Sequence, residues 1–178
     1  MYAPLRKGWF VSSRETELDA ALERLGAAFT KHEHEAVFTV SESEALHHEI
    51  AGAHTKNLFL KDEAGAFFLV TIPAEARANL KALPAVIGSR RLSFGKAEDM
   101  ERLLGVTPGS VTPLAAFNDA DGAVTVALDA ALAAADIVNV HPLRNTATVG
   151  MSGSDLVRAL QSWGHAPIIA HIPVLEDK

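Results

Sequence analysis

The chain has 178 residues, 48% of them hydrophobic and 21% charged, with a formal net charge of −6; these values fit one globular domain over residues 1–178 and exclude disordered, fibrous and coiled-coil proteins. The longest apolar run, residues 130–135, is far shorter than the ~20 residues that a membrane helix needs. No apolar signal core follows Arg6 and Lys7, so we expect a cytoplasmic protein with no membrane association. Without cysteine, disulfides, thiolate nucleophiles and cysteine zinc sites are also excluded.

Charge is unevenly distributed along the chain. Residues 13–49 and residues 97–178 each carry −6, whereas residues 50–96, with seven basic and three acidic side chains, carry +4. An acidic protein does not coat nucleic acid by bulk attraction, but a basic segment suits the docking of a limited piece of a polyanion. Scattered solvated charges are the alternative. The candidate patch residues are Lys56, Lys61, Lys81, Arg90, Arg91 and Lys96.

Helical and strand periodicities alternate in the first half of the chain. Alternation on both sides of the polar turn 62–65 predicts a hairpin in the interior of a sheet. The expected elements are a helix from Ser12 or Ser13 to Phe29, a strand at 36–40, a helix from Ser41, the hairpin strands 55–61 and 66–72, a helix at 74–83 that Pro84 ends, and a strand at 91–94.

The second half predicts more strands than helices. The expected elements are a helix at 97–104 closed by Gly105, a loop at 106–113, strands at 123–128, 137–140 and 146–151, a helix from Ser152 or Ser154 to Trp163, and a strand at 166–172. We therefore expect an α/β fold of the α+β type, whose mixed, largely antiparallel sheet curls into a partial barrel with flanking helices. A purely parallel, doubly wound sheet is disfavoured.

Several catalytic motifs are absent. His48-Glu49 is followed by His54 rather than by a histidine one turn later, so the zinc-protease pattern fails and we expect no metal. The run 150–153 lacks the serine-hydrolase elbow. No lysine follows Gly109-Ser110, and no dinucleotide glycine pattern occurs, so nucleotide cofactors are not expected.

Three segments carry polar or conformationally special residues in apolar surroundings. Lys56 falls on the strand face of Leu58 and Leu60, where a lysine either meets an anion or extends to solvent. Residues 105–113 contain two glycines and two prolines; they form either a rigid turn that presents backbone N–H groups or an ordinary connection. Residues 141–146 make a polar tip between two strands, where His141 has either a binding or a structural role.

Together these segments resemble the editing domain associated with bacterial prolyl-tRNA synthetase, which also occurs as freestanding proteins of the YbaK type. The resemblance runs from about Ser41 to Pro173 and rests on TKNLFLKD at 55–62, GVTPGSVTPLA at 105–115 and HPLRNTATVGM at 141–151. It implies a mixed sheet closing on itself, and an enzyme that hydrolyses the ester joining a wrong amino acid to the 3′ end of a tRNA. Asn57, His141-Pro142 and Asn145 are most similar to the freestanding, ProX- or PrdX-like branch that clears alanine from tRNA(Pro).

The resemblance also implies roles for individual residues. Lys56 would anchor the terminal adenosine, while backbone N–H groups around Gly109 and Ser110 would hold the carbonyl oxygen. The residues expected to bind substrate are Asn57, Gly105, Pro108, His141 and Asn145, and those expected to bind tRNA are Lys61 and Arg91. An aminoacyl ester is activated and has a ribose hydroxyl beside it, so positioning suffices and no cofactor or protein nucleophile is needed.

Specificity is expected to be steric, since a pocket that admits alanine can exclude the larger proline. The expected partners are the acceptor end of mischarged tRNA(Pro) and, further, prolyl-tRNA synthetase. Three alternatives stay open: a deacylase for cysteinyl-tRNA(Pro) or several small aminoacyl-tRNAs, a non-catalytic module of the same fold that binds tRNA or the synthetase, and a small-molecule binder.

Overall fold

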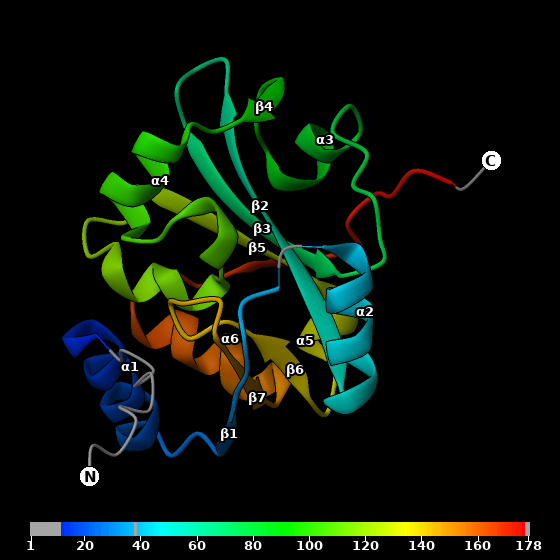
Figure 1. The fold of residues 1–178 in the computed structure, drawn as a ribbon. Coiled ribbons are helices and arrows are strands. Elements are labelled where there is room, and N and C mark those ends of the chain that lie inside the picture. Colours follow the sequence, from blue (N-terminus) through cyan, green and yellow to red (C-terminus); the bar gives the residue numbers. More distant parts are fainter. Residues whose placement is uncertain (1–11, 38, 177–178) are drawn as a thin grey trace, which may run out of the picture.

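The computed structural model describes residues 12–37 and 39–176, in which a central sheet is flanked by helices (Figure 1). The strands are β1 (Phe29–Glu33), β2 (Ala53–Asp62), β3 (Phe67–Pro73), β4 (Leu92–Phe94), β5 (Val124–Asp129), β6 (Val138–Val140), β7 (Ala147–Met151) and β8 (Ile168–Ala170). The α-helices are α1 (Ser13–Arg24), α2 (Val40–Glu49), α3 (Leu83–Ile87), α4 (Ala97–Leu104), α5 (Ala130–Ala133) and α6 (Gly153–Ser162). Two 3₁₀ helices, η1 (Pro108–Ser110) and η2 (Pro113–Asn118), follow α4.

The mixed sheet with flanking helices confirms the expected fold class, but the sheet is open and does not close on itself as the resemblance implied. Its strand order is β1-β7-β6-β2-β3-β5-β8, with β4 paired to β2 off this path. The pairs β1/β7, β6/β7, β2/β3 and β2/β4 are antiparallel, whereas β2/β6, β3/β5 and β5/β8 are parallel. The predicted hairpin is confirmed as β2 and β3, which lie in the interior of the sheet.

Strand β2 has one interrupted edge. Toward β3 it pairs continuously from Thr55 to Lys61. Its other edge pairs with β6 at Ala53 and His54 and with β4 from Leu60 onward, with no strand pairing between these ends among the described residues. The sheet therefore divides along β2, and the dividing stretch begins with the segment that holds Lys56 and Asn57.

Successive residues of β2 pack on opposite faces of the sheet, as their alternation predicts. Leu58 and Leu60 contact one apolar cluster, together with Val70 of β3. Phe59 packs in a second cluster, with Leu69 and residues of α4. The alternation confirms that Lys56 shares the strand face of Leu58 and Leu60.

The structure differs from the predicted elements at the N-terminal end. Helix α1 is capped by Ser12, as predicted, but it ends at Arg24, and Gly26 follows with a left-handed φ of 75°. Phe29 therefore begins β1 rather than ending the helix. The strand predicted at 36–40 is wrong in its described part, because Thr39 and Glu42 form the capping box of α2; residue 38 lies outside the described residues.

The prediction of a helix at 74–83 is also wrong. This segment is instead fixed by the C-terminal end of the described chain, since Asn79 N–H donates to Pro173 O at 2.8 Å and Ala78 forms a bridge with Val174. Pro84 lies in the first turn of α3, where its missing N–H has no consequence. By contrast, the predictions for the rest of the chain are confirmed to within a few residues. These are β4, α4 with its left-handed Gly105 cap, the strands β5 to β8, and the Ser152 cap of α6.

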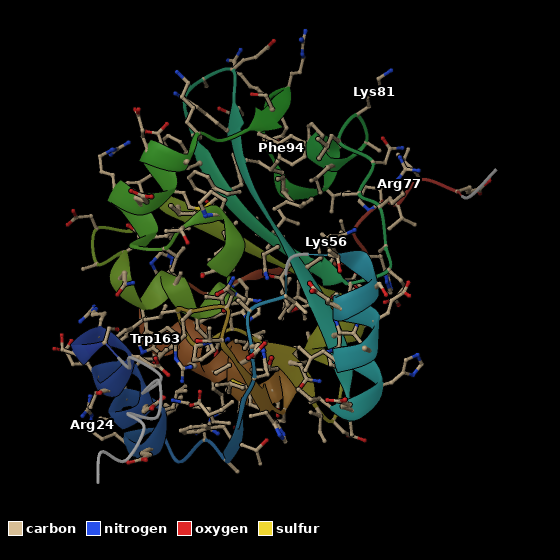
Figure 2. The ribbon with its side chains drawn as sticks, in the orientation of Figure 1. Arg24, Lys56, Arg77, Lys81, Phe94 and Trp163 are labelled. Atoms are coloured by element: carbon tan, nitrogen blue, oxygen red, sulfur yellow. The ribbon has the colours of Figure 1, made fainter. Side chains whose placement is uncertain are left out.

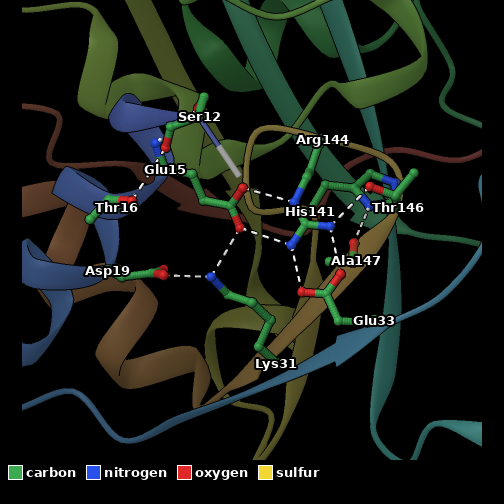
Figure 3. Close-up of polar contacts among 10 residues, drawn as sticks. All are labelled: Ser12, Glu15, Thr16, Asp19, Lys31, Glu33, His141, Arg144, Thr146 and Ala147. Atoms are coloured by element: carbon green, nitrogen blue, oxygen red, sulfur yellow. Dashed lines mark hydrogen bonds and ion pairs between the residues drawn. The ribbon is translucent and has the colours of Figure 1, made fainter. Parts of the chain in front are cut away.

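A buried ion-pair network ties α1 and β1 to the connection between β6 and β7 (Figure 3). The Glu15 carboxylate, only 1% exposed, accepts from Arg144 Nε at 2.8 Å and from Lys31 Nζ at 3.0 Å. Arg144 also donates to Glu33 at 2.7 Å, and these carboxylates, Glu33 first, raise the pKa of the guanidinium. Leu143, next to Arg144, has a left-handed φ of 69°, which costs a non-glycine residue energy. The network therefore holds the polar tip that includes His141.

We expect Glu15→Gln to lower the free energy of unfolding by about 1–3 kcal/mol at neutral pH, because it removes the buried anion that Lys31 and Arg144 share, although each cation keeps a second carboxylate, Asp19 or Glu33. Urea unfolding monitored by circular dichroism measures this loss. Glu17→Gln is the matched control on the same helix, since Glu17 pairs with Arg14 and both side chains are exposed. A comparable loss in the control would contradict a special role for the network.

Candidate active site

A cavity of about 840 Å³ lies beside the interrupted stretch of β2. Its walls come from β2, from α2 and the residues before it, from residues 74–77, from the loop at η1, and from the start of the β6–β7 connection. The lining residues are Val37, Thr39, Ser43, Glu44, His47, Thr55, Lys56, Asn57, Ala74, Glu75, Arg77, Pro108, Gly109, Val111 and His141. The structure thus brings five of the predicted site residues together: Lys56, Asn57, Pro108, Gly109 and His141.

Lys56 is half-buried and reaches the cavity from β2, beside α2 (Figure 2). Its ammonium forms no ion pair with any described carboxylate, although Glu44 and Glu75 line the same cavity. A half-buried ammonium without a carboxylate partner is suited to an anionic ligand. Lys56 can therefore pair with a phosphate or a carbonyl oxygen placed in the cavity.

Asn57 links the strand to the loop opposite. Its Oδ1 accepts from Thr71 Oγ1 at 2.6 Å, and its Nδ2 donates to Val111 O at 3.0 Å. These bonds span β3, β2 and the segment between η1 and η2. Asn57 lines the cavity, and the same side chain fixes the distance between Lys56 and the η1 loop.

The η1 loop offers fewer backbone donors than the sequence suggests. Gly105 N–H donates to Glu101 O at 3.0 Å and Ser110 N–H to Thr107 O at 2.9 Å, so neither is free. Gly105 acts as the cap of α4, and Ser110 is only 7% exposed; neither lines the cavity. Gly109 does line it, and its N–H has no hydrogen-bond partner among the described residues. Of the backbone N–H groups expected to bind the carbonyl oxygen, that of Gly109 is therefore the one that remains available in this loop.

His141 presents an acceptor nitrogen when its ring is neutral. Its Nδ1 lies 3.1 Å from Ala147 O, and because a carbonyl only accepts, Nδ1 carries the proton. Nε2 is then the acceptor of the neutral ring. Burial lowers the pKa of His141 despite the opposing hydrogen bond to Ala147, with a smaller contribution from His34. The neutral ring is therefore favoured at neutral pH.

A second, smaller hollow of about 90 Å³ adjoins the large cavity and shares five lining residues with it. The shared residues are Val37, Ser43, His47, Thr55 and His141. His47 stacks on His54 with ring centroids 4.0 Å apart, and burial, followed by the charge of His54, lowers the pKa of His47. The hollow is small and more polar than apolar, so it can hold only a small group.

Asn139 and Thr148 line this hollow and were missed by sequence reasoning. Asn139 is buried and donates through Nδ2 to Ala51 O at 3.0 Å, while its Oδ1 has no partner among the described residues. A polar residue inside the apolar strand sequence IVNV was the available signal for Asn139. Ser43 and His47 gave no such signal, because α2 reads as an exposed helix.

The remaining predicted site residues lie outside the lining of the large cavity. Asn145 adjoins it, since its Nδ2 is 3.4 Å from the position that a Cβ on Gly109 would take. Lys61 lies farther along β2, with its ammonium 5.3 Å from the centre of the Phe67 ring, and Arg91 lies 3.8 Å from Glu63. The tRNA-binding role of Lys61 and Arg91 stays a prediction.

Candidate metal-binding clusters and membrane-spanning helices are both absent from the described ranges 12–37 and 39–176. These ranges contain no cluster of three or more histidine, aspartate or glutamate side chains arranged to hold a metal ion. They also contain no helix of the length and apolarity that a membrane span requires.

Comparison with known proteins identifies the family. The family model for the aminoacyl-tRNA editing domain matches residues 34–159. A prolyl-tRNA synthetase associated domain-containing protein 1 from Danio rerio is 37% identical over 155 residues, covering 86% of this chain and 84% of the relative. The prolyl-tRNA editing protein ProX of Acetoanaerobium sticklandii is 35% identical over 147 residues, covering 82% of this chain and 90% of the relative.

Solved structures agree on the fold. A crystal structure described as a proposed trans-editing enzyme for prolyl tRNA synthetase superposes with a TM-score of 0.70, covering 94% of this chain and all of that one, at 20% identity. A crystal structure of the hypothetical protein APE2540 also gives a TM-score of 0.70, at 22% identity and 88% coverage of this chain. The chain belongs to the aminoacyl-tRNA editing domain family.

Proposed function

We propose that this chain is a trans-editing deacylase that hydrolyses the ester of mischarged alanyl-tRNA(Pro) in the cytoplasm, with prolyl-tRNA synthetase as a further partner. The observation that carries deacylation of a small aminoacyl ester is the small polar hollow of about 90 Å³ beside a cavity that holds Lys56, which has no ion pair among the described residues. Alanine is the small amino acid that the family resemblance implies. The name of the ProX relative supports prolyl-tRNA editing. The size of the hollow supports a short side chain over a longer one.

In the proposed reaction each group has a positioning or electrostatic role. Lys56 pairs with the phosphate of the terminal adenosine, and Gly109 N–H donates to the carbonyl oxygen as negative charge develops on it. Nε2 of neutral His141 accepts a hydrogen bond from the substrate ammonium. Water adds to the carbonyl carbon, the bond from that carbon to the ribose oxygen breaks, and a proton passes to the ribose oxygen. The products are free alanine and tRNA.

Rate enhancement in this scheme comes from holding the water, the ester and the neighbouring ribose hydroxyl in one orientation. No protein nucleophile takes part. Asn57 has a positioning role, since its bonds to Thr71 and Val111 set the width between Lys56 and Gly109. In this proposal proline is disfavoured because its ring needs more room than the methyl group of alanine, while a synthetase pocket built for proline cannot strongly reject alanine.

A second candidate is deacylation of cysteinyl-tRNA(Pro) or of several small aminoacyl-tRNAs. The size of the hollow favours this candidate as much as alanine, since serine and cysteine side chains are also short. The polar lining by Ser43, Thr55 and Thr148 suits a hydroxyl or thiol group. Comparison of substrates therefore has to include them.

The proposal is tested by presenting alanyl-, cysteinyl-, seryl- and prolyl-tRNA(Pro) to the purified protein and measuring deacylation. Alanyl-tRNA(Pro) is expected to be hydrolysed fastest and prolyl-tRNA(Pro) to be spared. Fastest turnover of the cysteine or serine ester would support the second candidate instead. Binding of tRNA without turnover of any ester would support a non-catalytic module.

Lys56→Ala is expected to lower kcat/KM for the preferred ester by about 10- to 100-fold, the usual effect of losing one charge-assisted hydrogen bond. Single-turnover deacylation measures the change. Arg24→Ala is the control, because it removes an exposed cation at the opposite end of the molecule (Figure 2). Unchanged rates in Lys56→Ala would contradict the site assignment.

The pH profile tests the role of His141. Because the pKa of His141 lies below its ordinary value of 6.5, the acceptor form dominates at neutral pH, and kcat/KM is expected to fall only as the pH drops below that value. Protonation there places a second positive charge beside the substrate ammonium. His141→Asn should be slower and lose this acidic limb, whereas His47→Gln should keep it. Loss of the limb in His47→Gln alone would assign the titration to His47.

A further inference from the structure

A groove of about 760 Å³ lies next to the candidate active site, on the side of the residue 77–82 segment. Lys56 and Arg77 line both the groove and the active-site cavity, so the two are continuous. Figure 2 shows Lys56, Arg77, Lys81 and Phe94 on the same side of the molecule, and all four line the groove. A polymer whose end lies in the active site can therefore leave through this groove.

The charged side chains that line the groove are all basic, whereas Glu44 and Glu75 line the adjoining active-site cavity. The lining of the groove includes Lys56, Arg77 and Lys81 and no carboxylate in the part of the chain that the structure describes. None of these three cations forms an ion pair with a described carboxylate. Beyond Lys81, a further hollow of about 620 Å³ is lined by Lys81 and Arg91. The groove is thus electrostatically complementary to a chain of phosphates.

The floor of the groove is apolar and presents an aromatic ring. Leu58, Leu80 and Leu175 line it, and Phe94 at the end of β4 is 66% exposed. An exposed aromatic ring beside unpaired cations is the combination that binds single-stranded nucleic acid, because bases stack on the ring while cations follow the backbone. Paired bases in a duplex do not offer their faces for such stacking.

The walls of the groove are preformed by backbone hydrogen bonds. Asn79 N–H donates to Pro173 O at 2.8 Å, and Leu175 N–H donates to Arg77 O at 2.8 Å. These bonds fasten the segment that carries Arg77 and Lys81 to the C-terminal end of the described chain. A groove held by backbone hydrogen bonds binds with little ordering cost.

We propose that this groove binds the single-stranded nucleotides that precede the terminal adenosine of the substrate, with a base stacked on Phe94 and phosphates paired with Arg77 and Lys81. The inference rests on the proposed function for the position of the ester, and it adds a binding site for the RNA outside the catalytic cavity. A purely apolar protein segment would not require three unpaired cations.

Two esters of different length test the groove. Alanyl-adenosine ends in the catalytic cavity, whereas an alanylated cytidine-cytidine-adenosine trinucleotide extends into the groove. Phe94→Ala is expected to lower kcat/KM for the trinucleotide ester about tenfold, and Lys81→Ala several-fold, the usual cost of losing one stacked base or one phosphate contact. Neither variant should change hydrolysis of alanyl-adenosine. Phe94→Trp keeps an aromatic plane and should retain activity on both, as should the distant Arg24→Ala.

Binding of the uncharged trinucleotide separates this inference from the proposed function. Fluorescence anisotropy with a 5′-labelled trinucleotide needs no hydrolysis, and the Kd should rise about tenfold in Phe94→Ala. If neither ester is hydrolysed while this shift is observed, the groove is supported and the deacylase proposal fails. Unchanged oligonucleotide binding in Phe94→Ala and Lys81→Ala would overturn the groove.

Two other outcomes would also overturn it. An equal loss on both esters would place Phe94 and Lys81 in the catalytic cavity. An effect of Phe94→Ala on binding of purified prolyl-tRNA synthetase or on self-association, with oligonucleotide binding unchanged, would make the groove a protein interface. Because Phe94 is mostly exposed, thermal melts of its variants should match the unmodified protein, which keeps the comparison free of unfolding.

Discussion

The interruption in strand pairing along one edge of β2 is the constraint on which the candidate site depends. Toward β3 the strand is held by a continuous ladder, whereas its other edge meets β6 at one end and β4 at the other. The segment between these pairings starts with Lys56 and Asn57, so one rigid backbone carries both residues at a break in the sheet. The alternation of side chains fixes the orientation of the strand, since Leu58 and Phe59 pack on opposite faces of the sheet.

This arrangement leaves several polar groups without protein partners. Within the described chain, the Lys56 ammonium lacks an ion pair, Gly109 N–H lacks an acceptor, and Asn139 Oδ1 lacks a donor. Of the three, only Asn139 Oδ1 is fully buried, and an unsatisfied buried polar group destabilises a fold unless a ligand or water completes it, whereas Lys56 is half-buried and Gly109 is exposed at the cavity. In the proposed reaction, donors and acceptors of this kind would hold an activated ester and water in position for hydrolysis.

Local sequence signals correctly predicted the helices and strands whose ends are determined by residues close in the sequence. The β2–β3 hairpin, α4 with Gly105 and α6 with Ser152 are examples, because a turn or a cap is encoded within a few residues. The segment 74–83 failed because residues 173–175, far away in sequence, determine its conformation. Pro84 was ambiguous, since proline ends one helix and begins another equally well.

The contrast between local signals and tertiary contacts also explains which residues of the candidate site could be predicted. Lys56, Asn57, Gly109 and His141 lie in segments of unusual composition, their roles were predicted from the family resemblance of those segments, and the structure brings them to one cavity. Ser43 and His47 on α2 could not be found in this way, because only the tertiary fold brings that helix to β2. Ser110 shows the converse: its N–H is used in the turn of η1, where it donates to Thr107 O, and a pattern of glycines and prolines does not reveal this.

The Arg144 network also bears on where the functional unit begins. The family model starts at residue 34, yet both carboxylates that hold Arg144, Glu15 and Glu33, precede it. A fragment trimmed to the matched residues would keep the guanidinium and lose its counter-charges, leaving the strained Leu143 turn unsupported beside His141. We therefore expect a stable fragment to need α1 and β1 as well as the matched residues, because both elements supply counter-charges to a residue beside the pocket.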